Sequence, residues 1–246
     1  MTLACRQLDL TRGAATVLHG VTTALSTGEI TAICGPNGAG KSSLLLAMAG
    51  LLDPLSGEAS LDGQPVQRMS ARTRAQRIGY LPQEAQVAWD VAVENIVRLG
   101  RLPHRDRGEE AVERAIAALD LEALRHRPVS RLSGGEKARA LLARVLAGEP
   151  DWLLADEPLA ALDIAHQLRL LRQFRETAGH GTGVVLVLHD LASAMNHADR
   201  VLVMQKGRLI ADGPPETALA PEVLAEVWGV TARWLGEPGA RALASG

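Results

Sequence analysis

The stretch EITAICGPNGAGKSSLLLAMAG, residues 29–50, decides the fold of this chain. Its first part, Glu29–Cys34, is a short apolar run that predicts a buried strand. A glycine-rich loop over Gly35–Gly40 follows, and Lys41–Ala49 predicts an amphipathic helix that ends at Gly50. A strand, a loop of the pattern G-x-x-x-x-G-K-[ST] and a helix, in this order, are typical of a phosphate-binding turn.

The residue types in this loop suit the grip of a nucleoside triphosphate. Glycines let successive N–H groups point at phosphate oxygens with no Cβ in the way, and the helix N-terminus adds its positive dipole end. Lys41 is placed to reach the β and γ phosphates, and the Ser42 hydroxyl can join the shell of a Mg²⁺ ion. A chance match is the alternative, and the correct flanks argue against it. The predicted binding residues are Gly35, Pro36, Asn37, Gly38, Ala39, Gly40, Lys41, Ser42 and Ser43.

Two adjacent carboxylates end another apolar run. Trp152–Ala155 predicts a buried strand, and Asp156 and Glu157 follow it. Ligands in open α/β sheets sit at such strand ends. Beside a phosphate loop, Asp156 would hold Mg²⁺ and Glu157 would orient or deprotonate the attacking water. The alternative is an acidic turn that caps the next segment, since Pro158 follows.

A second cluster of donors precedes a predicted helix over Glu136–Ala147. Ser133, Gly134, Gly135 and Glu136 place a hydroxyl and backbone N–H groups at a helix N-terminus, which predicts a second phosphate site. Ser-Gly-Gly-Glu also suits a capping box, and both interpretations can hold together.

Composition sets limits on the rest. The chain has 246 residues, and 26 basic against 28 acidic residues give a net charge of −2, so nothing indicates a nucleic-acid partner. No apolar run approaches the roughly 20 residues that a membrane span needs, and the N-terminus lacks a secretory-signal layout, so a cytosolic location is expected. Cys5 and Cys34 are too few for a disulfide framework, and both are expected to be buried.

The order of predicted elements indicates a layered α/β fold. Residues 1–83 and 150–213 form the α/β part, residues 84–149 read as an inserted helical subdomain, and residues 214–246 form a tail. Leu3–Leu10 and Val21–Leu25 alternate as an antiparallel edge sheet would. Further strands are predicted at Glu58–Leu61, Ile78–Leu81, Val184–Leu188, Arg200–Met204 and Arg208–Ala211, and further helices at Ala71–Arg77, Val91–Leu99, Glu109–Leu119, Ile164–Ala178, Leu191–Ala198 and Pro221–Trp228.

Six motifs in a fixed order give the chain a resemblance to the ABC ATPases. They are the loop Gly35–Ser42, Gln83 in Gly79–Gln83, Leu132–Glu136, Asp156-Glu157, the Ala161-Leu162-Asp163 turn and His189, and they cover nearly the whole sequence. The resemblance implies an α/β fold with a P-loop NTPase core, an antiparallel β edge sheet and an inserted α-helical subdomain. It also implies ATP as substrate and Mg²⁺ as cofactor.

The same resemblance implies that two copies face each other head to tail, as a homodimer. Each ATP would lie between the phosphate loop of one copy and Ser133–Glu136 of the other. Gln83 would sense the γ phosphate and Mg²⁺, His189 would contact the γ phosphate, and Asp163 would pair the two sites. Catalysis would then involve Glu157, His189 and Gln83, with Ser42, Gln83 and Asp156 around the metal. Read alone, without the resemblance, Gln83 is better interpreted as a polar loop residue and His189 as a helix cap.

The chain departs from the family pattern at a few positions. Arg12 stands where the family often places an aromatic ring under the adenine. A guanidinium plane can stack on a base, so Arg12 either takes that role or is simply solvated. Ser43 and Glu136 replace a common Thr and a common Gln, and both keep hydrogen-bonding ability.

Three function classes compete. They are the motor of a transporter whose permease is a separate chain, a soluble mechanical ATPase and a phosphotransferase. Transport is favoured, because a long heptad insertion and tandem copies are lacking and a phosphotransferase has no use for Leu132–Glu136. Residues 93–97 and 100–105, VENIV and GRLPHR, resemble the motors of importers for iron chelates, heme and vitamin B12.

That resemblance implies several partners and a place in the cell. The expected partners are transmembrane permease subunits and, indirectly, a periplasmic or lipoprotein substrate-binding protein, at the cytoplasmic face of the inner membrane. Motors of other importers, exporters and non-transport ABC ATPases stay as alternatives. Arg68, Arg72, Arg74 and Arg77 are expected to form an exposed basic face toward a permease.

Overall fold

The computed structural model describes residues 1–83, 90–160 and 162–245, and its centre is a six-stranded sheet. The strand order is β10-β9-β3-β8-β7-β6, with every neighbouring pair parallel except the edge hairpin β9–β10. The strands are β3 (Ile30–Cys34), β6 (Ile78–Leu81), β7 (Trp152–Asp156), β8 (Gly183–Val187), β9 (Arg200–Gln205) and β10 (Arg208–Gly213). Every residue of β3, β7 and β8 is buried, as expected for parallel strands covered on both faces.

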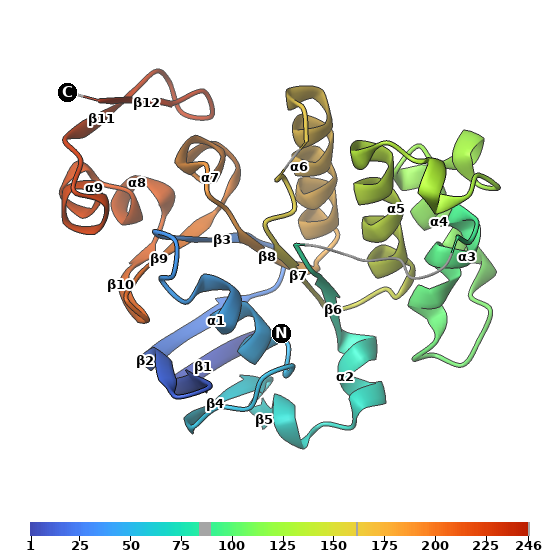
Figure 1. Ribbon diagram of the computed structural model, residues 1–246, viewed down its shortest axis with the longest axis horizontal. Coiled ribbons are helices and arrows are strands. Elements are labelled where there is room, and N and C mark those ends of the chain that lie inside the picture. Colours follow the sequence, from blue (N-terminus) through green and yellow to red (C-terminus); the bar gives the residue numbers. More distant parts are fainter. Residues whose placement is uncertain (84–89, 161, 246) are drawn as a thin grey trace.

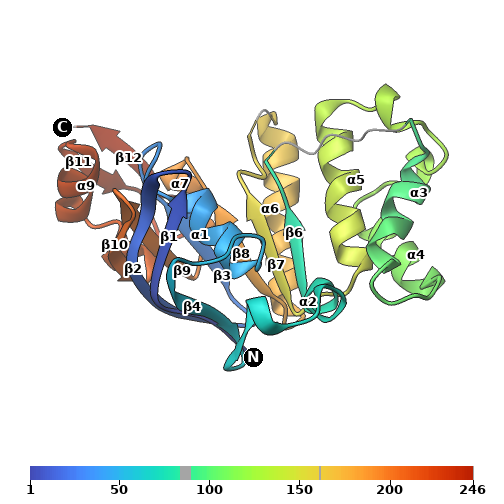
Figure 2. The ribbon, with the colours of Figure 1, turned by 60° about the horizontal axis from the view of Figure 1, so that its bottom comes forward.

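A separate antiparallel sheet covers one side of this core (Figure 2). Its order is β2-β1-β4-β5, from β1 (Thr2–Arg12), β2 (Ala15–Ser26), β4 (Ser56–Leu61) and β5 (Gln64–Pro65). Helix α1 (Lys41–Met48) contacts strands of both sheets. Six of its eight residues are buried, so the predicted amphipathic character is wrong: a helix packed between two sheets has almost no solvent face.

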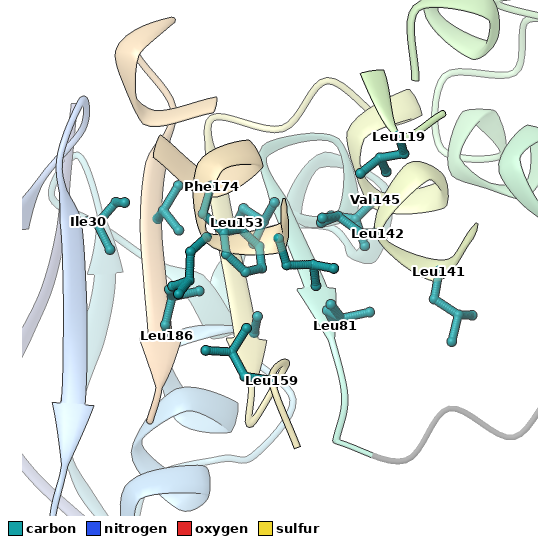
Figure 3. Packing of buried hydrophobic residues seen from close by; sticks show 14 of the residues in the cluster. Ile30, Leu81, Leu119, Leu141, Leu142, Val145, Leu153, Leu159, Phe174 and Leu186 are labelled. Atoms are coloured by element: carbon teal, nitrogen blue, oxygen red, sulfur yellow. The ribbon is translucent and has the colours of Figure 1, made fainter. Parts of the chain in front are cut away.

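Three helices that follow β6 in the sequence lie together at the right of Figure 1. They are α3 (Val93–Arg98), α4 (Glu109–Ala118) and α5 (Gly134–Ala147), and α5 contacts the edge strand β6. Helix α6 (Ile164–Gly179) packs on the sheet itself, against β3 and β8. One apolar cluster continues from the sheet into these helices: Ile30, Leu153 and Phe174 belong to the same cluster as Leu142 and Val145 (Figure 3). The remaining helices are α2 (Ala71–Arg77), α7 (Leu191–His197), α8 (Pro215–Ala218) and α9 (Pro221–Trp228), with 3₁₀ turns at Val66–Arg68, Leu99–Arg101, Glu122–Leu124 and Val129–Arg131.

The chain closes with a small hairpin of β11 (Ala232–Leu235) and β12 (Ala242–Ser245), which the sequence did not predict. Asn196 at the end of α7 fastens the turn that precedes β12. Its Nδ2 donates to the Arg241 carbonyl, and its Oδ1 accepts from the Arg241 N–H, both at 2.8 Å. No helix in the described part of the chain combines the length and apolar character that a bilayer span requires.

The predicted basic face around α2 is wrong. Arg68 and Arg72 are exposed, but Arg77 bridges Asp62 and Asp151, with both N–O distances at 2.6 Å. Arg74 lies over Gly50, where an added Cβ would come within 2.7 Å of its Cδ. The local sequence does not reveal these distant contacts, which leave Arg74 and Arg77 only partly exposed.

Candidate active site

The phosphate loop is held against both sheets by two glycines. Gly35 has φ +151°, and a Cβ there would lie 2.2 Å from the Met204 carbonyl oxygen of β9. Gly40 has φ +99°, and its Cβ would lie 2.7 Å from the Val17 carbonyl oxygen of β2. Any larger residue at either position would clash with backbone and adopt an unfavourable conformation. The loop therefore curves as the sequence predicted, at the carboxyl end of β3.

Residues from distant parts of the chain line one cavity of about 490 Å³ above this loop. Gln83 follows β6, Glu157 follows β7 and His189 follows β8, so the ends of three strands meet the loop. Arg12 at the end of β1 also lines the cavity, as a residue expected near the base would. The full set is Arg12, Val17, Asn37, Gly38, Ala39, Gly40, Lys41, Ser42, Ser43, Gln83, Glu157 and His189.

Lys41 lies folded against the loop itself. Its Nζ donates hydrogen bonds to the carbonyl oxygens of Gly35 at 2.9 Å and Pro36 at 3.0 Å. Burial lowers the pKa of the Lys41 ammonium group, while the negative charges of Glu157 and Asp156 oppose this shift. A poorly hydrated ammonium group at the N-terminus of α1 is well suited to bind polyphosphate oxygens.

Ser42 and Asp156 form the second polar pair of the site. The Ser42 hydroxyl donates to Asp156 Oδ1 at 3.0 Å, and Asp156 is buried at the end of β7. Burial raises the pKa of Asp156, and the hydrogen bond from Ser42 and the charge of Lys41 lower it. Carboxylate and hydroxyl oxygens are hard donors of the kind Mg²⁺ prefers, so this pair fits that ion.

Glu157 is held from two sides. Gln83 Nε2 donates to Glu157 Oε2 at 2.6 Å, and His189 Nε2 lies 2.5 Å from Glu157 Oε1. Glu157 has φ +48°, a conformation uncommon for a residue with a side chain. Both carboxylate oxygens thus have a fixed partner, and the structure brings together the three residues expected to act in catalysis.

The residues Ser133, Gly134, Gly135 and Glu136 are not among the described residues that line this cavity. Ser133 caps α5, and Ser133 and Glu136 form the capping box: the Ser133 N–H donates to Glu136 Oε2 at 2.7 Å, and the Glu136 N–H donates to Ser133 Oγ at 3.3 Å. Asp163 likewise caps α6. Ala161, the first residue of the predicted turn, lies outside the described residues.

Comparison with known proteins identifies the family. Residues 18–160, more than half of the chain, match the family model described as ABC transporter. The chain belongs to the ABC transporter family.

The relatives of this ABC transporter subunit extend over nearly its full length. The hemin import ATP-binding protein HmuV of Streptomyces coelicolor is 46% identical over 88% of this chain and 79% of that protein. The HmuV of Myxococcus xanthus is 41% identical over 97% of this chain and 95% of that protein. Among solved structures, cbiO1 from Clostridium perfringens, part of the ABC transporter complex cbiONQ, superposes with a TM-score of 0.79 at 29% identity, over 91% and 92% of the two chains. Accordingly, this ABC subunit is an ATP-hydrolysing enzyme.

Sequence reasoning missed one residue that contacts the predicted machinery. His166 is bonded to Asp163 and lies against Gly135. Its position three residues after a helix cap is a signal for the first contact. No sequence pattern indicates the contact between His166 and Gly135, because the tertiary fold brings α5 and α6 together there.

Proposed function

We propose that this chain is the ATP-hydrolysing subunit of a hemin importer and works as a homodimer of two head-to-tail copies. The hemin-import names of its relatives, at 41–46% identity over most of the chain, support this cargo. The observation that carries the dimer is the separation of the two predicted phosphate sites: the loop and Glu157 share one cavity, which Ser133–Glu136 do not line.

ATP would bind with its phosphates over the loop. Backbone N–H groups of Gly38 and Gly40, with the N-terminus of α1, would surround the phosphate oxygens, while the Ala39 N–H donates to the Pro36 carbonyl and closes the loop. Lys41 would turn from its two carbonyl partners to the β and γ phosphates, since a charged phosphate oxygen is the stronger acceptor. The guanidinium of Arg12 would stack on the base at the outer end of the cavity.

Ser42, Asp156 and Gln83 are the residues that would hold Mg²⁺. A bound Mg²⁺ would offset negative charge on the β and γ phosphate oxygens. Burial and the charge of Glu157 raise the pKa of Asp156, whereas the hydrogen bond from Ser42 and the charge of Lys41 favour its charged form.

Glu157 would act as the general base. Its carboxylate would take a proton from the water that attacks the γ phosphorus, and the bond to the β–γ bridging oxygen would break. His189 would contact the γ phosphate, and Gln83 would sense it. Because both residues also bond Glu157, they would fix the angle at which the carboxylate meets the water.

Ser133–Glu136 of the second copy would complete each site. The Glu136 N–H is taken by Ser133 Oγ, so the N–H groups of Gly134 and Gly135 at the start of α5 would donate to the γ phosphate of the facing copy. Asp163 would connect the two sites across the interface. ATP would thus hold the dimer closed, and hydrolysis would release it.

The permease would dock at an apolar groove beside Gln83. A cavity of about 570 Å³ lies between α2, β6 and the 99–103 segment, and Leu51, Leu99 and Leu102 at its lining are 51%, 44% and 69% exposed. Tyr80 on β6 lines this groove. Because Tyr80 precedes Gln83 by three residues, movement of the groove would be passed to Gln83 in the nucleotide site. We assign the occupant as a cytoplasmic helix of the permease, with this subunit peripheral to the inner membrane.

The chain would work as one ATP-binding domain with moving parts. The helical subdomain, residues 84–149, would rotate relative to the α/β part, residues 1–83 and 150–213. Residues 214–246 would form an added tail.

The test is reconstitution with a hemin permease and its substrate-binding protein. In proteoliposomes, the hemin-loaded binding protein should stimulate ATP hydrolysis and hemin uptake together, and Glu157→Gln should abolish both. Stimulation by a ferric siderophore or cobalamin, with none by hemin, would refute the cargo. ATP hydrolysis by a strictly monomeric subunit would refute the shared site.

A further inference from the structure

His166 connects the two helix N-termini that stand outside the nucleotide cavity. Asp163 Oδ1 accepts a hydrogen bond from the His166 backbone N–H at 2.9 Å and lies 2.8 Å from its ring Nδ1. A carboxylate only accepts hydrogen bonds, so Nδ1 carries the proton. His166 is therefore fixed to the residue that caps α6.

The other edge of the same ring packs on the start of α5. A Cβ added at Gly135 would lie 2.4 Å from Cδ2 and 2.7 Å from Nε2 of His166. At Gly134, one residue earlier, an added Cβ would have no neighbour within 4 Å. A side chain at position 135 would therefore collide with the imidazole ring, whereas the backbone at Gly135 is ordinary helix.

The His166 ring is largely enclosed between Asp163 and Gly135. The His166 side chain is 26% exposed, whereas Asp163 is 67% exposed. Removing the ring would leave the backbone cap of α6 intact, because the His166 N–H still donates to Asp163. The loss would fall on the link between α6 and α5 and leave the fold of α6 unchanged.

We propose that His166 is a positioning residue that sets Ser133–Glu136 relative to Asp163 and so governs how readily two copies close on ATP. This rests on the proposed function, in which both helix N-termini face the nucleotide of the other copy. Neither contact touches the cavity of the same copy, so nucleotide binding to the phosphate loop should not depend on it.

The experiment measures ATP-driven association in a Glu157→Gln background by analytical ultracentrifugation. This parent must dimerise with MgATP, and a parent that stays monomeric refutes the shared site before His166 is altered. Adding His166→Ala should weaken the dimer about tenfold, within the range for residues in contact. Affinity for ADP, by calorimetry, should stay within about twofold. An unchanged dimer constant overturns the proposal.

Three variants separate positioning from folding. His166→Asn keeps a donor to Asp163 but lacks the ring, so it should lose as much as Ala, and full recovery would show that Gly135 is not involved. As a single variant, Gly135→Ala should weaken association of the two copies. Combined with His166→Ala it should add little further loss, and strictly additive effects of the two substitutions would contradict a shared contact. His180→Ala, at the exposed far end of α6, is the matched control and should have no effect.

Discussion

His189 Nε2 and Glu157 Oε1 lie 2.5 Å apart, although the two residues follow different strands of the central sheet. Gln83 binds the second carboxylate oxygen from a third strand. Parallel strands deliver their carboxyl ends to one edge, so residues 74 and 32 positions from Glu157 reach it together. The Glu157 carboxylate is thereby oriented by the fold itself.

Glu157→Gln should lower kcat by about 10² to 10⁴, because an amide cannot accept the proton of the attacking water. ATP affinity should stay within about threefold, since the shape of the site is kept. Phosphate release and calorimetric ATP binding measure the two effects. Glu226→Gln, an exposed carboxylate on α9, is the control, and equal kcat in both variants would refute the role of Glu157.

Lys41→Ala should weaken MgATP binding by at least about thirtyfold, because one charged hydrogen-bond donor to the phosphates is lost. Calorimetry checks this directly. Arg169→Ala removes an exposed cation on α6 and should leave affinity unchanged. Equal affinity for native protein and Lys41→Ala would place the triphosphate elsewhere.

Arg77→Ala should destabilise the fold by about 1 kcal/mol at neutral pH, since a half-exposed ion pair is worth little more. The hydrogen bond from Arg77 holds the pKa of Asp62 below its usual 3.8. A carboxyl with a lowered pKa stabilises above its ordinary pKa and loses this as pH falls through the folded value. The difference between native and variant should therefore shrink below about pH 4.

Urea unfolding at neutral and acid pH measures this difference. Arg68→Ala, an exposed arginine on the same segment, should change stability by less than about 0.5 kcal/mol at every pH. A constant difference for Arg77→Ala across the acid range would show that Asp62 does not depend on it.

Cys5 and Cys34 should resist alkylation in the native protein. Both are buried, and burial raises the pKa of each thiol to about 12, so very little thiolate forms near neutral pH. Iodoacetamide should modify neither residue at pH 8 with or without ATP, and both in denaturant. Native labelling of Cys34 that ATP blocks would instead show that this thiol is accessible and lies close to the bound nucleotide.

Leu102→Asp should abolish permease binding while basal ATP hydrolysis stays within about twofold, because it places a charge in the apolar groove. Co-purification with the permease measures the first effect. Leu235→Asp is the matched control, since Leu235 is also exposed, at 47%, on the terminal hairpin. Equal loss in both variants would assign the docking surface elsewhere.

Sequence patterns located several short elements. The helices Ala71–Arg77 and Pro221–Trp228 and the strand Ile78–Leu81 have the predicted bounds. The loop and the acid pair were predictable because glycine conformation and paired carboxylates have a chemical meaning at short range. Family resemblance supplied Gln83 and His189, which local pattern alone left open.

The features that sequence did not predict depend on contacts between distant segments. The hairpin β11–β12 has half-exposed strands and takes its place through Asn196 and Arg241, 45 residues apart. Arg77 turns to acids 15 and 74 residues away. The ring of His166 and the bare backbone of Gly135 meet in the same way. Such pairings follow from topology, which no local window contains.

The backbone contacts at Gly35 and Gly40 have one further consequence. Carbonyl groups from strands of both sheets brace the glycine loop, so its curvature is a property of the folded protein and needs no ligand contact to exist. A binding site that is already rigid loses little conformational entropy when it binds its ligand. The free energy released when phosphate meets this loop is thus free to drive movement elsewhere in the subunit.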